Sequence, residues 1–217
     1  MQRSAVFRPL AEIVAMAGLL ISYIWGWEGA FEGDFTLCVI LYLGIGLAAH
    51  IRAKESPTAF GLRLDNVGGA ARDALLATVS IGLILLSIGA LLGSLDFPAL
   101  PRWPRILLTG IAWGAIQQYG LLGIFYRRFG ELLPGTRGPL LAASGVFGLL
   151  HLPNPFLTVA TFGAGALSCW LYRRAPNLII LGIMHGIIAF LIVETLPDVI
   201  TMGMRVGPGF FNFHPGQ

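Results

Sequence analysis

Long apolar runs separated by short polar segments dominate this chain. The runs cover residues 10–27, 35–51, 74–95, 104–126, 138–152, 156–172 and 178–196. A helix needs about 20 consecutive apolar residues to cross the hydrocarbon core of a bilayer, and most of the runs approach that length. The fifth run is short, and only Pro153, Asn154 and Pro155, which favour a tight turn, separate it from the sixth. The pattern predicts an all-α polytopic transmembrane helix bundle of about seven helices.

The composition supports the same class. Of the 217 residues, 56% are hydrophobic and only 12% are charged, whereas a soluble domain has about 25% charged residues. Cys38 and Cys169 lie in separate apolar runs and form no CxxC motif, so they indicate neither a disulfide nor a metal framework. We therefore expect an integral membrane protein in contact with membrane lipid.

The distribution of basic residues predicts the orientation. With a cytoplasmic N-terminus, the outer segments contain only Arg102, Arg105 and Arg205 of the 14 basic residues. Cytoplasmic segments of membrane proteins are enriched in Lys and Arg, so this distribution predicts the N-terminus inside, the C-terminus outside and an odd number of helices. The same topology accounts for the net charge of +3, and no nucleic-acid partner is predicted.

Polar segments divide the chain into three parts within one membrane domain. Residues 1–55 are expected to form two N-terminal transmembrane helices, residues 56–196 a membrane core, and residues 197–217 an irregular C-terminal tail rich in Gly and Pro. A polar connector runs from His50 to Asp73. Its second half, from Val67, is expected to lie along the inner surface before the third helix begins.

Four polar side chains within the apolar runs are the candidate site residues. They are Gln117, Gln118, His151 and His185. Ionisable or amide groups are costly in hydrocarbon, so they should face protein or a water-filled cavity, and they mark functional sites. Phe147 lies four residues before the first histidine, on the same helix face, where it could fix that ring. The alternative interpretation is a structural polar cluster that joins three helices.

Paired glycines predict close packing around the second histidine. Gly110 and Gly114 form one small-xxx-small pair, and Gly182 and Gly186 form another that flanks His185. Such pairs let the backbones of membrane helices approach closely. The helix face that carries this histidine is therefore expected to press against a neighbouring helix, although the glycines could serve packing alone.

Three segments resemble the CAAX protease and bacteriocin-processing family (CPBP, or abortive-infection proteins), which includes the type II CAAX prenyl endopeptidases. The run from Phe147 to His151 matches the FxxxH motif of the family, with Asn154 close behind. The segment from Gly165 to His185 follows the spacing to the last family histidine, and the run from Phe60 to Arg63 is similar to the motif before the family core. The resemblance covers about residues 56–195.

The resemblance implies a mechanism in which a Glu-Glu pair activates water for attack on a peptide bond. The two histidines, with an Asn or Asp four residues after the second, would stabilise the oxyanion or hold a metal. In this chain Gln117 and Gln118 occupy the Glu-Glu positions, Leu122 replaces an arginine, and Ala189 replaces the Asn or Asp. Both histidines remain. An amide cannot act as a general base, so the catalytic pattern is degenerate.

Other residues could replace the missing base only under strict conditions. Glu12 would need helix one to lean toward the core, and Glu131 lies beyond helix four. Glu194 follows the second histidine by nine residues and should project about 180° away from it. One histidine could itself act as the base. A Ser144 or Cys169 nucleophile is conceivable, but no sequence signature supports either.

Three hypotheses follow for the function. The favoured one is a pseudoprotease that binds or scaffolds a transmembrane protein partner without cutting it. The first alternative is a divergent intramembrane endopeptidase with a site centred on His151 and His185, and the second is a membrane enzyme that acts on a lipid or polyprenyl substrate. A metal held by the two histidines is not favoured, and the cofactor stays unknown. The resemblance implies a bacterial cytoplasmic (inner) membrane.

Overall fold

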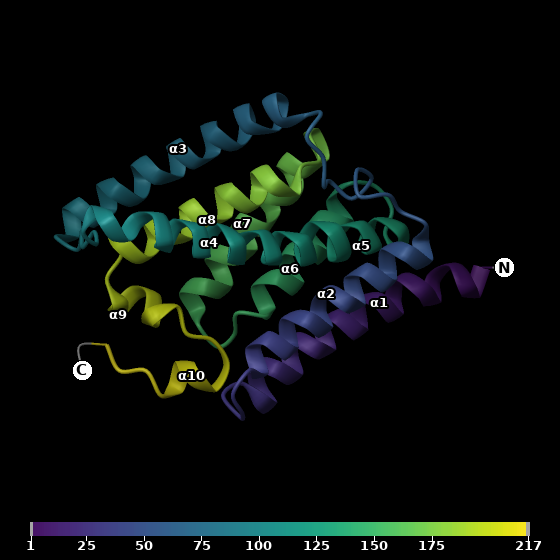
Figure 1. Ribbon diagram of the computed structural model, residues 1–217, viewed down its shortest axis with the longest axis horizontal. Coiled ribbons are helices and arrows are strands. Elements are labelled where there is room, and N and C mark those ends of the chain that lie inside the picture. Colours follow the sequence, from purple (N-terminus) through teal and green to yellow (C-terminus); the bar gives the residue numbers. More distant parts are fainter. Residues whose placement is uncertain (1, 216–217) are drawn as a thin grey trace.

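The computed structural model describes residues 2–215, with side chains from residue 6 onward, and this part of the chain is helical without strands (Figure 1). Its elements are α1 (Gln2–Ser22), η1 (Tyr23–Trp27), α2 (Asp34–Ala53), α3 (Val67–Leu92), η2 (Leu100–Arg102), α4 (Trp103–Gln118), η3 (Tyr119–Tyr126), α5 (Arg127–Leu132), α6 (Arg137–Leu149), α7 (Pro155–Arg174), α8 (Leu178–Thr195), α9 (Asp198–Thr201), η4 (Met202–Met204) and α10 (Gly207–Phe211). The predicted class, an all-α polytopic membrane protein, is confirmed.

Five helical stretches within the described residues are long and apolar enough to cross a membrane. They are Val6–Trp27, Asp34–Ala53, Val67–Leu92, Pro155–Arg174 and Leu178–Thr195. The predicted run over residues 104–126 lies within α4–η3–α5, three elements that follow one another without a break. The run over residues 138–152 corresponds to α6, which has only 13 residues. A helix of that length spans about 20 Å, less than the hydrocarbon core. The number of crossings therefore stays a prediction.

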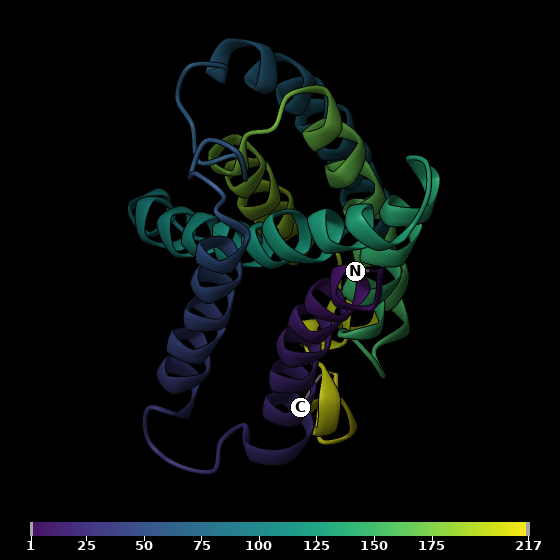
Figure 2. The same ribbon diagram turned by 90° about the vertical axis from the view of Figure 1, so that its right-hand side faces the viewer.

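The α4–η3–α5 stretch runs through the centre of the bundle. Figure 2 shows the α1–α2 hairpin on one side of it and α3 on the other. The most extensive helix packing joins α4 to α8, followed by α6 with α7 and α3 with α8, while α1 contacts α2 and α5. The core therefore lies where the central stretch meets α6, α7 and α8.

The two ends of the bundle differ in character. The N-terminus, the connector and α5 lie at one end, and α9, α10 and the C-terminus lie at the other (Figure 1). Opposite ends are what an odd number of crossings requires. The inner basic residues of the predicted topology belong to the first end, which we call the basic end. Which end faces the cytoplasm stays a prediction.

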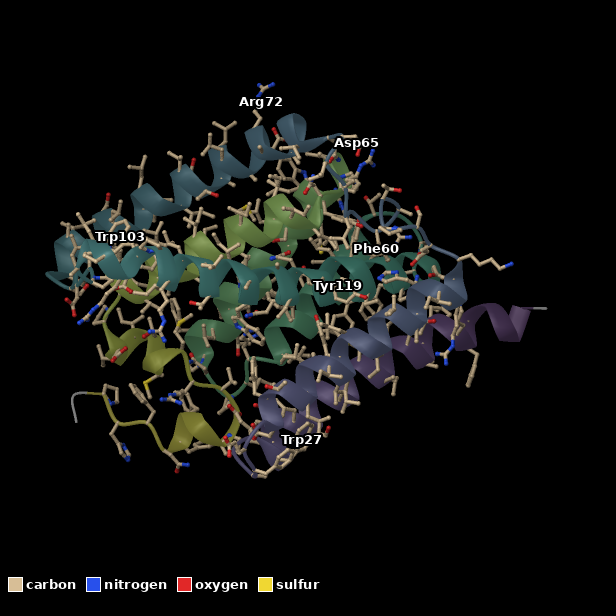
Figure 3. All side chains as sticks on the ribbon, in the orientation of Figure 1. Trp27, Phe60, Asp65, Arg72, Trp103 and Tyr119 are labelled. Atoms are coloured by element: carbon tan, nitrogen blue, oxygen red, sulfur yellow. The ribbon has the colours of Figure 1, made fainter. Side chains whose placement is uncertain are left out.

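Aromatic and amide contacts hold the connector against the core. Phe60 stacks on His50 of α2 with ring centroids 3.9 Å apart, and it lies 6.1 Å from Tyr119 of η3 (Figure 3). Asn177 donates to the carbonyl oxygen of Arg63 and caps α8 by accepting from its backbone. The connector is thus a packed part of the basic end.

The third helix begins earlier than the pattern indicated. It is continuous from Val67, so the prediction of a surface segment before this helix is wrong. The first turns are rich in Gly and Ala, and Ala70 and Ala74 are buried against the bundle. Small residues lower the local hydropathy, but they still allow a helix to pack closely.

The C-terminal tail contains short helical turns and contacts the turn between α6 and α7. Asn154 caps α7 and donates to the carbonyl oxygens of Thr201 and Arg205 at 2.9 and 3.0 Å. The amide of Gly207 donates to the carbonyl oxygen of Leu152. One fully buried asparagine therefore anchors the tail beside the site helices.

Candidate functional site

Helices α4 and α8 touch backbone to backbone at the candidate site. A Cβ atom at Gly186 would lie 2.6 Å from the Cα and N atoms of Ile111, and one at Gly114 would lie 2.8 Å from the carbonyl oxygen of Gly182. Real Cβ atoms essentially never approach so closely, so only glycine fits. The prediction that the helix face around His185 presses against a neighbour is confirmed.

This contact brings Gln118 of α4 to His185 of α8. The Nε2 atom of Gln118 lies 3.0 Å from Nδ1 of His185 and 3.2 Å from Oγ of Ser168 in α7. An amide nitrogen carries two hydrogens, so it can donate to both. In this arrangement Nδ1 of the imidazole is an acceptor, and the ring proton belongs on Nε2. The Gln118 side chain is 1% exposed, and its Oε1 atom has no partner among the described residues.

His151 lies just beyond α6 and is held in the opposite tautomer. Its Nδ1 atom is 2.7 Å from the carbonyl oxygen of Phe147, which can only accept a hydrogen bond, so Nδ1 carries the proton. The Nε2 atom of this ring then has the lone pair. The Phe147 ring meets both imidazoles edge to face, with centroids 5.1 Å from His151 and 6.2 Å from His185. One histidine thus presents an acceptor and the other a donor.

A cavity of about 550 Å³ lies beside the two rings, between the α1–α2 hairpin and the core. Side chains from α1, α2, α4, α6, α7, α8 and the tail line it, and most of them are apolar. Gln117, His151 and His185 are among them, whereas Gln118 lies behind His185. We call this space the histidine cavity. Its volume is in the range of sites that hold small organic ligands.

Two carboxylates also line the histidine cavity. Glu194 is one of them, because the cavity follows α8 past Ala189 and Val193 to its end. Glu28, in the loop after η1, was not singled out from the sequence. Burial, and next the nearby charge of Asp34, raise the pKa of the Glu28 carboxyl above its ordinary value.

The other two candidate glutamates belong to a separate cluster at the basic end. Arg128 of α5 is fully buried and forms ion pairs with Glu12, Glu55 and Glu131. We call these four residues the arginine cluster. A catalytic role for Glu12 required α1 to lean toward the core. Helix α1 does pack against α5, but the Glu12 carboxylate forms an ion pair with Arg128. The sequence analysis missed the cluster, although a pair of arginines ending an apolar run was a signal.

The alternative nucleophiles are packed away from the histidine cavity. Ser144 donates to the carbonyl oxygen of Leu140, and both Ser144 and Cys169 are fully buried. Neither is among the described residues that line the cavity. The geometry gives no support to a serine or cysteine nucleophile.

The donor set around the histidines does not fit a metal. Within the part of the chain that the structure describes, no group of three or more His, Cys, Asp or Glu residues could hold an ion. The Nδ1 lone pair of His185 is already engaged by Gln118, and a glutamine amide is a poor ligand for zinc.

Comparison with known families shows what the core is similar to. Residues 98–191 match the family model described as type II CAAX prenyl endopeptidase Rce1-like. Over this segment, which is less than half of the chain, the protein is similar to that family. The match runs from just before α4 into α8 and includes all four predicted site residues, while α1, α2 and α3 lie outside it. The comparisons found no matching curated protein and no matching solved structure.

Proposed function

We propose that this CAAX endopeptidase-like protein is a pseudoprotease. In this proposal its histidine cavity binds an apolar, membrane-embedded segment of a partner protein and does not cut it. The observation that carries the proposal is the contact between Gln118 and His185, in which an amide stands where the family resemblance implies a catalytic glutamate. The same replacement occurs at Gln117, which lines the cavity.

The amide changes what His185 can do. A glutamate at this position would accept the Nδ1 proton and could shuttle protons to water, whereas the amide Nε2 donates to Nδ1 and leaves His185 as a donor only. Loss of a general base costs about 10²–10⁴ in rate, and loss of an oxyanion donor at Ala189 about another 10²–10³. Together these losses favour binding over catalysis.

The cavity itself suits an apolar occupant. It lies between the hairpin and the core, where Phe35 of α2 packs against Trp113 of α4 with centroids 5.4 Å apart. Both rings line the cavity and are partly exposed. An apolar pocket with a few convergent polar groups is the usual form of a ligand site. Membrane lipid also contacts this surface.

Gentle extraction of the tagged protein from native membranes, followed by quantitative mass spectrometry, tests the proposal. We expect a near-stoichiometric membrane partner with both the wild type and His151→Ala. Ala189→Trp, which fills the cavity, should remove that partner. Ala90→Trp, on the exposed face of α3, is the matched control and should retain it. Loss of the partner from His151→Ala alone, or its retention in Ala189→Trp, would contradict the proposal.

A divergent intramembrane endopeptidase is the second candidate. It is favoured by one observation: His151 and His185 line one cavity in opposite tautomers, so that one ring could accept a proton while the other donates. In that case an uncut membrane protein should accumulate in His151→Ala membranes, and no stable partner should be recovered with the wild type. The same mass spectrometry experiment therefore separates the two candidates.

A further inference from the structure

A tyrosine of the N-terminal hairpin reaches into the backbone of the central stretch. Tyr42 of α2 is 5% exposed, and its Oη atom donates a hydrogen bond to the carbonyl oxygen of Ile116 in α4 at 2.8 Å. A Cβ atom at Gly120 of η3 would lie 1.9 Å from the same Oη atom, so only glycine leaves room for this side chain. The hydroxyl thus lies against the backbone on both sides of Gln117 and Gln118.

The central stretch changes its helical form at this point. It is α-helical up to Gln118 and continues from Tyr119 as the π-helix η3, in which backbone hydrogen bonds join residues five apart. In an unbroken α-helix the carbonyl oxygen of Ile116 would accept from the amide of Gly120, four residues further on. The Tyr42 hydroxyl lies next to both of these groups and competes with that bond. A side chain inserted among the backbone bonds of a helix is a known cause of such a break, and π-helical turns often occur at functional sites.

A second tyrosine makes the reverse contact. Tyr119 lies between the central stretch and α2 (Figure 3), and a Cβ atom at Gly46 of α2 would be 2.3 Å from its Oη atom. The rings of Tyr42 and Tyr119 meet edge to face with centroids 6.2 Å apart. Each of the two elements therefore places a tyrosine against a glycine of the other. This interlock fixes the Tyr42 hydroxyl, whereas the Tyr119 hydroxyl lies against α2 and not against α4.

The position of the break bears directly on the histidine cavity. Gln118, whose amide contacts His185, is the last residue of α4, and Gln117 before it lines the cavity together with Tyr42. Upstream, the backbone contact of Gly114 with α8 fixes α4 in place. An α-turn and a π-turn hold different numbers of residues, so a shift of the break by one residue would rotate the side chains around it about the helix axis.

We propose that Tyr42 is a positioning residue for the histidine cavity. Its hydroxyl holds the change from α-helix to π-helix directly after Gln118 and so aims this amide at His185. Tyr42 lies outside the segment that matches the family model, so the hairpin supplies a control that the matched segment does not contain. The histidine cavity must be the functional site for this role to matter, so the inference rests on the proposed function, whether the site binds or cuts.

Nitrogen-15 NMR of the full-length protein in detergent, with labelled histidines, tests this proposal. The two ring nitrogens of His185, assigned with His185→Gln, should give the separate signals of one tautomer in the wild type. Tyr42→Phe keeps the ring and removes the hydroxyl, so the contact with Gln118 should loosen. The single tautomer should then be lost, and the two signals should move toward each other. The signals of His151 should stay unchanged, since the carbonyl oxygen of Phe147 holds that ring.

Tyr119→Phe is the matched control, because it removes a hydroxyl from the same interface that lies against α2. It should leave the signals of His185 unchanged. Gly120→Ala is the second variant, in which the tyrosine is kept but the new Cβ atom displaces its hydroxyl, so it should reproduce the change seen in Tyr42→Phe. Gly44→Ala, in α2, has no heavy atom within 4 Å of the added Cβ atom and is the control for that substitution.

The results separate positioning from support of the fold. A hydroxyl that only stabilised the bundle would lower the unfolding temperature of Tyr42→Phe and leave the signals of His185 as in the wild type, which would overturn the proposal. An equal change in Tyr119→Phe would overturn it as well, because it would show a general loosening of the interface. No partner takes part in this experiment, so its failure is distinct from a failure of the proposed function in the mass spectrometry experiment.

Discussion

Two of the groups of buried polar side chains in the bundle are held in different ways. In the arginine cluster, the fully buried Arg128 contacts three carboxylates from α1, the connector and α5. At the histidine cavity, the Gln118 amide contacts His185 and Ser168, and His151 contacts a backbone carbonyl oxygen. Ion pairs hold the first group, and hydrogen bonds without an ion pair hold the second.

The difference separates a structural role from a functional one. Glu12 lies in α1 and Glu55 in the connector, so their ion pairs with Arg128 tie the N-terminal hairpin to the family core. The hairpin in turn forms one wall of the histidine cavity. The ion pairs of the arginine cluster therefore hold the hairpin in place, and His151 and His185 line the cavity that the hairpin helps to enclose.

The largest effect should come from removing the centre of the arginine cluster. Arg128→Met leaves the buried Glu12 without its partner and removes one of the partners of Glu55, and it should destabilise the protein by about 3–5 kcal/mol. Thermal unfolding of the purified protein in detergent measures this. Arg174→Ala breaks an exposed ion pair with Asp73 and should cost about 0–1 kcal/mol. Similar losses of stability in the two variants would show that the arginine cluster does not hold the N-terminal hairpin against the core.

Acid should weaken the same cluster through Glu55. Burial alone would raise the pKa of this carboxyl, but hydrogen bonds from Arg128, Arg127 and His50 outweigh burial and lower the pKa from 4.5 to about 2. Because the folded-state pKa is depressed, the stabilisation is fully present above the unfolded pKa of about 4.5 and is lost progressively as pH falls toward 2. Unfolding temperatures between pH 6 and pH 3 measure it.

Glu55→Gln provides the comparison for that acid profile. The variant cannot take up a proton at this position, so it should begin less stable at pH 6 and lose less stability than the wild type on acidification. Parallel profiles for the two proteins would assign the acid sensitivity to other carboxylates.

A smaller effect is expected where glycine brings α4 and α8 together. Gly186→Ala forces a Cβ atom to 2.6 Å from the backbone of Ile111 and should cost about 1–3 kcal/mol through overpacking. Gly110→Ala lies in the same interface, but its Cβ atom would be 3.6 Å from the nearest heavy atom, so it should be tolerated. Unfolding temperatures of the two variants test this ordering, which equal shifts would contradict.

The smallest effect should come from Gln118 itself. Gln118→Met loses two hydrogen bonds of about 1 kcal/mol each and also removes the buried Oε1 atom that lacks a partner, so the two changes nearly cancel. We expect the unfolding free energy to stay within about 1 kcal/mol of the wild type. A loss of 3 kcal/mol or more would make the histidine site a structural cluster, which is the alternative interpretation of these residues.

The sequence by itself determined the class of the protein, because the length and apolarity of a run are local properties that a bilayer selects directly. It also marked His151, His185, Gln117 and Gln118, since polar groups in such runs are rare and costly. The family match of residues 98–191 agrees with the motifs read from the chain. The functional roles of the four residues stay predictions.

Only the tertiary structure decided which of these groups meet. The pairing of Gln118 with His185 joins residues 67 positions apart, and the ion pair of Glu12 with Arg128 joins α1 to α5. Helical periodicity gives the direction of a side chain around its own helix. It does not give the shape of the space between helices, which extends along α8 as far as Glu194. Long-range contacts and cavity shape arise from packing between helices, which no single segment encodes.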